Sequence, residues 1–476
     1  MRSRVQFIIL YSLLFSFSTF AQDATASREV NNKVFMHYMA WYGAGEDGNH
    51  WKDGTAQEPI IGFYNSQSWS THLYHILISS ALGVDGMVVN VRTDYDEASL
   101  KMLFPSLQRI VDVDADFNYQ IAVSYDDQDM TIESVKEELA VLRDDIIGTT
   151  DHYLHAGDDP VIFIWNYDGF LSSEDYREAV SATFPTKNAV LLRNEIDFNT
   201  TKEAIDSYYP WVQGFDDEGT NWGEGYLDWY YRTLQIREDI AFSTGGVWAG
   251  FDDRAASWGQ NRWIDRKDGE TLQQTWDLIH KYQEESAIKW VILETWNDWN
   301  EGTELEPSKE HGFAYATKSA ENIAAFKDTT YVVNDSLFSA ATKLYFAAEM
   351  IETGERDSAT FYGFLQDAIG SFIDRDAKGA LTSLDQIINP VVALASSQEL
   401  VVPEIYPNPS FGLVNIPLPN EKAEVTIHDF AGKKVYTQVV DPAQKAIQWN
   451  ASGAQGLYLI EITTQTQKSV QRLIVQ

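Results

Sequence analysis

The sequence of 476 residues contains no cysteine and few basic side chains. Without cysteine the chain has no disulfide framework, no thiolate nucleophile and no lipoprotein anchor, so packing must supply its stability. Only 35 Lys and Arg residues stand against 71 Asp and Glu residues, and the formal net charge is −36 at pH 7. This charge would repel nucleic-acid phosphates, so no nucleic-acid partner is expected. It also disfavours a densely sulfated or uronic substrate unless arginines cluster locally.

Long apolar runs are absent beyond the N-terminus. Arg2 and Arg4 precede an apolar run over residues 5–20, and Thr19-Phe20-Ala21 forms a small-residue cleavage pattern. Residues 1–21 are therefore predicted to be a signal peptide, so the mature protein is expected to leave through the periplasm and become secreted or cell-surface. No later stretch has the apolar length of a membrane span.

Apolar and aromatic residues are plentiful. Hydrophobic residues make up 44% of the chain, with 15 Trp and 24 Tyr. The length predicts two or three folding units, each able to bury a core. The aromatic residues support carbohydrate contacts, although they also fill cores.

Short apolar runs alternate with helical patterns from residue 33 to residue 328. The expected strands are 34–43, 83–91, 119–127, 160–167, 189–193, 211–216, 242–251 and 289–295. Helical spacing at 71–82 and 134–142 falls between expected strands. This order predicts a parallel sheet, and about eight such units predict an α/β fold, a (β/α)8 TIM barrel over residues 33–328.

Aromatic and acidic residues gather where the expected strands end. Such clusters occur at 41–42, 126–127, 165–167, 216–218 and 252–254. The carboxyl ends of barrel strands meet at one face, where active sites of this fold are built. The residues predicted to contact substrate from these strand ends are Trp41, Tyr42, Asp126, Trp165, Tyr167, Asp252 and Arg254.

The segment after the last expected strand carries a pair of carboxylates, Asp298 and Glu301. Residues three apart on a strand point to opposite faces, so these two converge only if the chain turns after Asp298. Asn300 and Gly302 favour such a turn. Two converging carboxylates are the minimal equipment for cleaving a glycosidic bond. Trp296, Asn297 and Trp299 are predicted to contact the sugar, the alternative being an acidic surface loop whose tryptophans belong to the core.

The segment resembles the last-strand motif of glycoside hydrolase families 71 and 99. Residues 302–307 read Gly-Thr-Glu-Leu-Glu-Pro and are similar to family 99, the endo-α-mannosidases. Asp298 and Asn300 stand where family 99 has Glu and His, and an Asp at the first position is similar to family 71, the α-1,3-glucanases. Residues 39–43, 83–86 and 250–254 are similar to family 99 motifs of the first, second and seventh strands.

The resemblance implies a secreted, endo-acting hydrolase of α-glycosidic bonds in an α-mannan, an α-glucan or an algal galactan. Glu301 would be the general acid/base and Asp298 the partner carboxylate. In family 99 that partner deprotonates the sugar 2-hydroxyl to give a 1,2-anhydro intermediate; direct nucleophilic attack stays equally open here because Asp is shorter than Glu. Retention is expected, and a wide carboxyl separation would instead indicate inversion.

Two other functions remain open at this stage. The protein could be a non-catalytic cell-surface glycan-binding protein, in which case both carboxylates would be dispensable. It could also be a glycosyltransferase, which export disfavours because nucleotide-sugar donors are cytoplasmic. No cofactor is expected, and no metal site either: the alternation of Asp112, Asp114 and Asp116 lacks the glycine and distal glutamate of an EF-hand and is interpreted as a solvated turn. His37, inside an apolar strand, is interpreted as a core histidine.

The pattern changes beyond the barrel. Residues 336–351 and 358–388 have helical spacing, so residues 329–395 are expected to form a short helical spacer. Residues 401–476 read as short strands with turns, a small β-sandwich. This part resembles the C-terminal sorting domain of the type IX secretion system of Bacteroidetes, in the Tyr-Pro-Asn-Pro of 406–409, the turn at 429–433 and the basic Lys468 and Arg472. The resemblance implies the type IX machinery as a partner, and a carbohydrate-binding module is the alternative.

Overall fold

The computed structural model divides the chain into two compact units, residues 1–389 and 390–476. The residues that it describes are 31–43, 49–126, 130–165, 171–184, 189–194, 205–330, 333–390, 400, 402–429, 433–452, 455–464 and 467–476. The predicted signal peptide and Tyr167 lie outside these residues.

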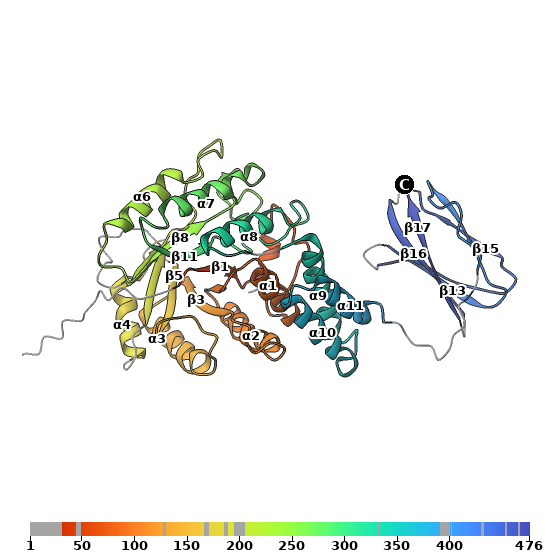
Figure 1. The fold of residues 1–476 in the computed structure, drawn as a ribbon, viewed down its shortest axis with the longest axis horizontal. Helices are drawn as coiled ribbons and strands as arrows, with labels where there is room; N and C mark the ends of the chain where they lie inside the picture. The colour runs from red at the N-terminus through yellow and green to blue at the C-terminus, as the bar shows by residue number, and fades with distance from the viewer. Residues whose placement is uncertain are drawn as a thin grey trace, which may run out of the picture. The chain divides into compact units, whose positions relative to one another are not determined.

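A parallel barrel forms the centre of the first unit (Figure 1). Its strands, in the order of hydrogen-bonded neighbours, are β7 (Ser207–Tyr209), β6 (Val190–Asn194), β5 (Asp159–Trp165), β3 (Gln120–Asp126), β2 (Gly86–Val91), β1 (Lys33–Met39), β11 (Ile288–Leu293) and β8 (Ser243–Val247). The short β4 (His155–Ala156) pairs with β5. Among the described residues this is the predicted (β/α)8 barrel.

The barrel closes between β7 and β8 without a regular ladder. Ala241 N–H donates to the Asp206 carbonyl at 2.7 Å, and the Ser207 hydroxyl donates to the Phe242 carbonyl at 2.5 Å. Pro210 follows β7 directly and cannot donate to a ladder, so the pairing stops there. The prediction of a strand at 211–216 is therefore wrong, because the strand is 207–209 and the residues after Pro210 form the loop beyond its end.

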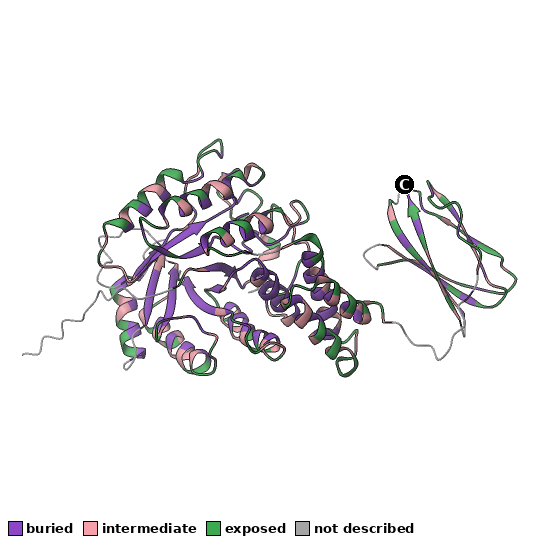
Figure 2. Ribbon diagram, viewed as in Figure 1, coloured by how far each residue is buried: buried purple, intermediate pink, exposed green. Residues whose placement is uncertain are grey.

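Helices cover the outside of the barrel, with their buried faces towards the strands (Figure 2). They are α1 (Trp69–Ala81), α2 (Asp94–Val111), α3 (Ile132–Val141), α4 (Ser173–Thr183), α6 (Glu224–Gln235), α7 (Glu270–Tyr282) and α8 (Ala314–Phe326). Short 3₁₀-helices occur at His50–Asp53 and Lys267–Gly269, and a π-helical segment, Leu142–Ile147, continues α3. A hairpin of β9 (Phe251–Asp252) and β10 (Trp263–Ile264) follows β8.

Three further helices, α9 (Asp335–Glu352), α10 (Ser358–Ile373) and α11 (Ala377–Ile388), belong to the same compact unit as the barrel. The Glu352 carboxylate accepts hydrogen bonds from the backbone N–H groups of Trp69 and Ser70, at the start of α1. Arg375 donates to the Ala81 carbonyl at the other end of α1. These contacts satisfy helix-terminal groups that would otherwise lack partners, and they hold the three helices against the barrel.

The second unit is a β-sandwich with its own core. One sheet pairs β12 (Leu413–Pro417) with β15 (Ala446–Asn450), and the other has the order β14 (Lys434–Val440), β13 (Ala423–Asp429), β16 (Gly456–Thr463), β17 (Lys468–Val475). All the pairs are antiparallel. Alternate residues of the strands, among them Val414, Val425, Ile460 and Leu473, fill the space between the sheets.

Candidate active site

The inward-facing residues of the barrel change character from one end to the other. At the amino end they are apolar, with Phe35, Val88, Phe163, Leu192 and Ile292 in one buried cluster. Because side chains alternate along a strand, the next inward positions towards the carboxyl end are His37, Asn90, Trp165, Asn194 and Glu294. The barrel is thus a packed core below and a polar site above.

A cavity of about 1060 Å³ opens at the carboxyl end of the strands. Its apolar wall consists of Met39, Trp41, Trp165, Trp211, Val212, Phe215, Tyr226, Phe251 and Trp258. Its polar wall consists of His50, Asp53, Asn90, Arg92, Thr93, Asp96, Asp126, Asn194, Gln213, Gln260, Arg262, Asp298, Asn300 and Glu301. This volume lies at the upper end of the range for ligand pockets. The wall combines several aromatic rings with a larger number of polar and charged side chains that converge on the same space.

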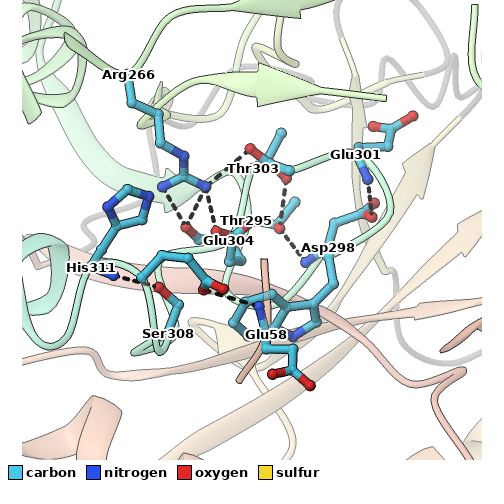
Figure 3. A network of polar contacts seen from close by, with 12 residues as sticks. Glu58, Arg266, Thr295, Asp298, Glu301, Thr303, Glu304, Ser308 and His311 are labelled. Atoms are coloured by element: carbon cyan, nitrogen blue, oxygen red, sulfur yellow. Dashed lines mark hydrogen bonds and ion pairs between the residues drawn. The ribbon is translucent and has the colours of Figure 1, made fainter. Parts of the chain in front are cut away.

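Asp298 and Glu301 lie on a tight turn beyond β11. The backbone N–H of Glu301 donates to Asp298 Oδ1 at 3.0 Å, and Thr303 N–H donates to the Asp298 carbonyl at 3.1 Å. Asp298 N–H donates in turn to Thr295 Oγ1 at 2.8 Å (Figure 3). The predicted turn after Asp298 is confirmed, and it brings both carboxyl groups to the wall of one cavity.

Gly302 fixes how closely this turn approaches the β9–β10 hairpin. Its φ is +57°, a conformation that side-chain-bearing residues rarely adopt. An added Cβ would lie 3.0 Å from atoms of Asp252. This close approach allows Asp252 N–H to donate to the Glu301 carbonyl at 2.6 Å. The turn that carries Glu301 is therefore held from both sides.

The two carboxyl groups differ in their ionisation. Burial raises the pKa of Asp298 to about 6, while the N–H groups of Glu301 and Asn300 and the nearby His37 oppose the rise. Burial raises the pKa of Glu301 well above its ordinary value, and the neighbouring Asp298 carboxylate raises it further. Asp298 thus ionises first, and its charge keeps the proton on Glu301. Such a pair can supply one carboxylate and one carboxylic acid at the same pH.

A buried pair lies under the cavity. His37 Nδ1 and Glu294 Oε2 are 3.0 Å apart, and both side chains are fully buried. Burial raises the pKa of Glu294, and His37 opposes this effect. The His37 ring also packs edge-on against Trp211, which lines the cavity. His37 is a core histidine with a hydrogen-bond partner, and it supports the floor of the site.

Trp296, Asn297 and Trp299 lie in the core and not on the cavity wall, in contrast to the expectation that they contact sugar. Asn297 bridges to β1, because its side chain accepts from Met39 N–H at 2.8 Å and donates to the Met39 carbonyl at 2.9 Å. Trp299 Nε1 donates to the Tyr64 hydroxyl at 3.3 Å. The tryptophans pack behind the turn. The prediction failed because residues at a strand end point inward or outward according to their register, which the sequence does not show.

Tyr42 is also buried and does not line the cavity. Its hydroxyl donates to Asn300 Oδ1 at 3.1 Å and accepts from Trp299 N–H at 2.9 Å. Asn300 extends this bridge through its amide, which donates to the carbonyls of His50 and Gly54. Tyr42 therefore supports the turn of Asp298 and Glu301 from behind, whereas the sequence predicts that it contacts substrate.

Asp252 and Arg254 bind each other instead of facing the cavity. Arg254 Nε and Nη2 donate to the two Asp252 oxygens at 2.8 and 2.7 Å. The Arg254 guanidinium lies 4.6 Å from the centre of the Trp263 ring and is largely exposed. The acidic residues 216–218 form an exposed turn, in which Asp216 accepts from the Thr220 and Asn221 N–H groups. Their position after a predicted strand end does not bring them to the cavity.

Trp41, Asp126, Trp165, Asp298 and Glu301 are the predicted site residues that line the cavity together. Those that the sequence did not single out include Asn90, Asn194, Asp96 and Arg262. Asn90 and Asn194 occupy the last inward positions of their strands. Counting two residues forward along each strand from the buried apolar residues Val88 and Leu192 would have identified them, because side chains alternate between the two faces. Arg262 lies on the β9–β10 hairpin, and no strand-end pattern points to it.

A network of buried polar groups supports the other side of the turn. Glu306 accepts from the Tyr64 hydroxyl at 2.9 Å through Oε2, and its Oε1 lies 3.0 Å from His75 Nε2. The Tyr64 hydroxyl also accepts from the Asn297 amide at 3.0 Å. Glu304 pairs with Arg266, which also donates to the Gly302 carbonyl (Figure 3). The Glu-rich tail of the motif is therefore structural.

Comparison with known proteins assigns the C-terminal unit. Residues 404–476 match the family of secretion system C-terminal sorting domains. The chain is accordingly exported by the type IX system and is secreted or cell-surface. Among the described residues no helix combines the length and the apolar character needed to cross a bilayer.

Comparison with solved structures concerns the barrel. The chain is similar to the family 99 endo-α-mannosidase of Bacteroides thetaiotaomicron, with 14% identity and a TM-score of 0.52, over 63% of this chain and 99% of that one. A second structure of that enzyme, in complex with bis-tris-propane, has 16% identity and the same TM-score and coverage. The fold is therefore shared. A sequence search of curated proteins found no match.

Proposed function

We propose that the barrel is a glycoside hydrolase that cleaves internal α-glycosidic bonds of a polysaccharide. The observation that carries this proposal is the Asp298–Glu301 pair, two carboxyl groups of opposite ionisation on the wall of one aromatic-lined cavity. The shared fold with a family 99 endo-α-mannosidase supports the proposal. The volume of the cavity and its tryptophans, Trp41, Trp165, Trp211 and Trp258, support binding of several sugar rings.

Glu301 is the general acid in this proposal. A carboxylic acid that keeps its proton near neutral pH can protonate the departing glycosidic oxygen, and the resulting carboxylate can later take a proton from water. Glu301 suits this role because burial and the Asp298 charge raise its pKa. Its side chain keeps a fifth of its surface exposed, so it can reach a substrate.

Asp298 is the partner carboxylate. It ionises first and is held by the Glu301 and Asn300 N–H groups, so it can act either on the sugar 2-hydroxyl or directly on the anomeric carbon. Both routes give retention, and the proposal leaves the choice between them to experiment.

The test is product analysis on α-mannan, α-1,3-glucan and algal galactans with the mature protein, Glu301→Gln and Asp298→Asn. The expected result is release of oligosaccharides by the wild type from one glycan and loss of release in both variants. Retention of a glycan by all three proteins without cleavage would instead establish a glycan-binding protein and reject hydrolysis. The stereochemistry of the first product, followed by NMR, distinguishes retention from inversion.

A further inference from the structure

Arg262 is a charged residue of the cavity wall that has no part in the proposed chemistry so far. It directly precedes β10, on the hairpin that follows β8. Its guanidinium Nη2 lies 3.8 Å from Glu301 Oε1. At this distance the two groups form an ion pair but no hydrogen bond. Arg262 therefore attracts the carboxyl group without donating a hydrogen bond to either of its oxygens. Both oxygens of Glu301 remain available to a substrate.

Asp253 holds Arg262 in this place. Arg262 Nε donates to Asp253 Oδ2 at 2.8 Å, and Arg262 N–H donates to Oδ1 at 2.8 Å. Gln260 N–H donates to the same carboxylate at 3.1 Å. Asp253 is fully buried, so its carboxylate requires these donors. The side chain of Arg262 is therefore fixed at its Nε, and its Nη2 is the guanidinium nitrogen near Glu301.

Two aromatic rings fix the plane of the same guanidinium. Its central carbon lies 5.4 Å from the centre of the Phe215 ring and 5.0 Å from that of Phe251. Both phenylalanines line the cavity. The planar, permanently charged guanidinium of arginine is well suited to cation–π contact of this kind, because it can lie against the face of a ring.

The hairpin also holds the backbone of Glu301. Asp252 N–H donates to the Glu301 carbonyl at 2.6 Å, one residue before the carboxylate that holds Arg262. Two consecutive residues thus hold Glu301. Asp252 holds its backbone directly, and Asp253 acts on its side chain through Arg262. Rigid contacts of this type keep the position of a catalytic group within the small range that the reaction geometry allows.

We propose that Arg262 is a positioning residue for Glu301, held by Asp253 and by the faces of Phe215 and Phe251 so that its charge orients the acid and offsets the surrounding carboxylates. The proposal rests on the proposed function for its meaning in catalysis. The charged groups that face Glu301 are Asp298 on its own turn, Asp126 at the end of β3, and Asp253 and Arg262 on the hairpin. Arg262 is the cation in this set, and the other three are acidic.

The decisive measurement is the titration of the Glu301 carboxyl group by ¹³C NMR, with its resonance identified by its loss in Glu301→Gln. Arg262→Gln should raise the Glu301 midpoint by about 1–3 pH units, because an opposite charge at this distance has an effect of that size. Arg262→Met keeps the packing between the phenylalanines and removes the charge, so it should give the same rise. Arg262→Lys keeps a positive charge and should give a much smaller one.

Arg254→Gln is the matched control for the titration. It removes the same charge from the same hairpin, but Arg254 is paired with Asp252 and does not line the cavity. Its effect on the Glu301 midpoint should be clearly smaller. An unchanged midpoint in both Arg262→Gln and Arg262→Met, or equal shifts in the Arg254 and Arg262 variants, would overturn the proposal.

Once a cleaved glycan is known, kinetic assays test the role of Arg262 independently of the NMR titration. Arg262→Gln should lower kcat about 10²-fold with a much smaller change in KM, since the acid is displaced while the binding surface remains. The alkaline limb of the kcat/KM profile should move to higher pH, because Glu301 stays protonated longer. If the wild type cleaves no glycan, the proposed function fails, and the NMR titration still decides whether Arg262 controls Glu301.

Discussion

The two units of this chain differ in whether they bury polar side chains. In the barrel the turn beyond β11 buries Asn297, Asp298, Asn300, Glu304 and Glu306 almost completely. In the sandwich the interior is apolar, and several large apolar side chains face outward, with Phe411 80% and Val439 60% exposed.

The buried polar residues mark the barrel as the unit that carries the candidate site, whereas the sandwich has only an apolar core. Burying carboxyl and amide groups costs free energy unless each finds partners, and a fold keeps them where chemistry needs a fixed geometry. The sandwich has an ordinary two-sheet core and needs no such groups.

The largest expected effect is loss of catalysis without loss of fold. Glu301→Gln should lower kcat/KM by about 10²–10⁴-fold, because the amide cannot transfer a proton. Rates on the glycan that product analysis identifies, together with circular dichroism melts, check this prediction. Activity near that of the wild type would show that the polar cluster of the barrel serves another purpose.

The buried network behind the turn should be worth more stability than any polar residue of the sandwich. Glu306→Ala removes the partner of both Tyr64 and His75, and should lower the unfolding free energy of the barrel by about 3–5 kcal/mol. The exposed Glu421→Ala in the sandwich should change it by less than about 0.5 kcal/mol. Urea unfolding followed by tryptophan fluorescence measures both, and equal effects would remove the contrast between the units.

The charge of Asp298 should cost stability at neutral pH. Its folded pKa of about 6 lies above its ordinary value of 3.8, so the folded state binds the proton more tightly and loses stability as pH rises between these values. Asp298→Asn cannot titrate, so at pH 7 it should be more stable than the wild type by about 1–3 kcal/mol. The gain should shrink as pH falls from 7 towards 4. Denaturant unfolding at a series of pH values checks this, and a gain independent of pH would contradict it.

The smallest expected effect concerns the sandwich itself. Deletion of residues 390–476 should leave kcat/KM of the barrel unchanged, because the described site residues all belong to the first unit. The same deletion should abolish export from a type IX-competent host, since it removes the sorting domain at 404–476. Assays of the purified barrel and of cell fractions measure the two outcomes. A loss of activity would show that the units cooperate.

The sequence by itself determined the fold class and the order of most elements, with the strand expected at 211–216 as an exception. Apolar runs with helical spacing between them predict the barrel, because period-two and period-3.6 patterns reflect which faces must be buried. Asn300 and Gly302, beside Asp298 and Glu301, predict the turn, since few residues other than glycine adopt the positive φ found at Gly302. The sorting domain follows from motifs that lie close together in the chain.

Only the tertiary structure decided which of the marked residues face the cavity. Trp299 and Tyr42 are behind the turn and Trp41 is in front of it, because adjacent residues at a strand end point to opposite sides and the local sequence carries no sign of which side is the cavity. Arg262 reaches Glu301 across 39 positions of the sequence only through the fold of the hairpin and the buried Asp253. Contacts of that kind depend on long-range packing, and no local pattern of residues encodes them.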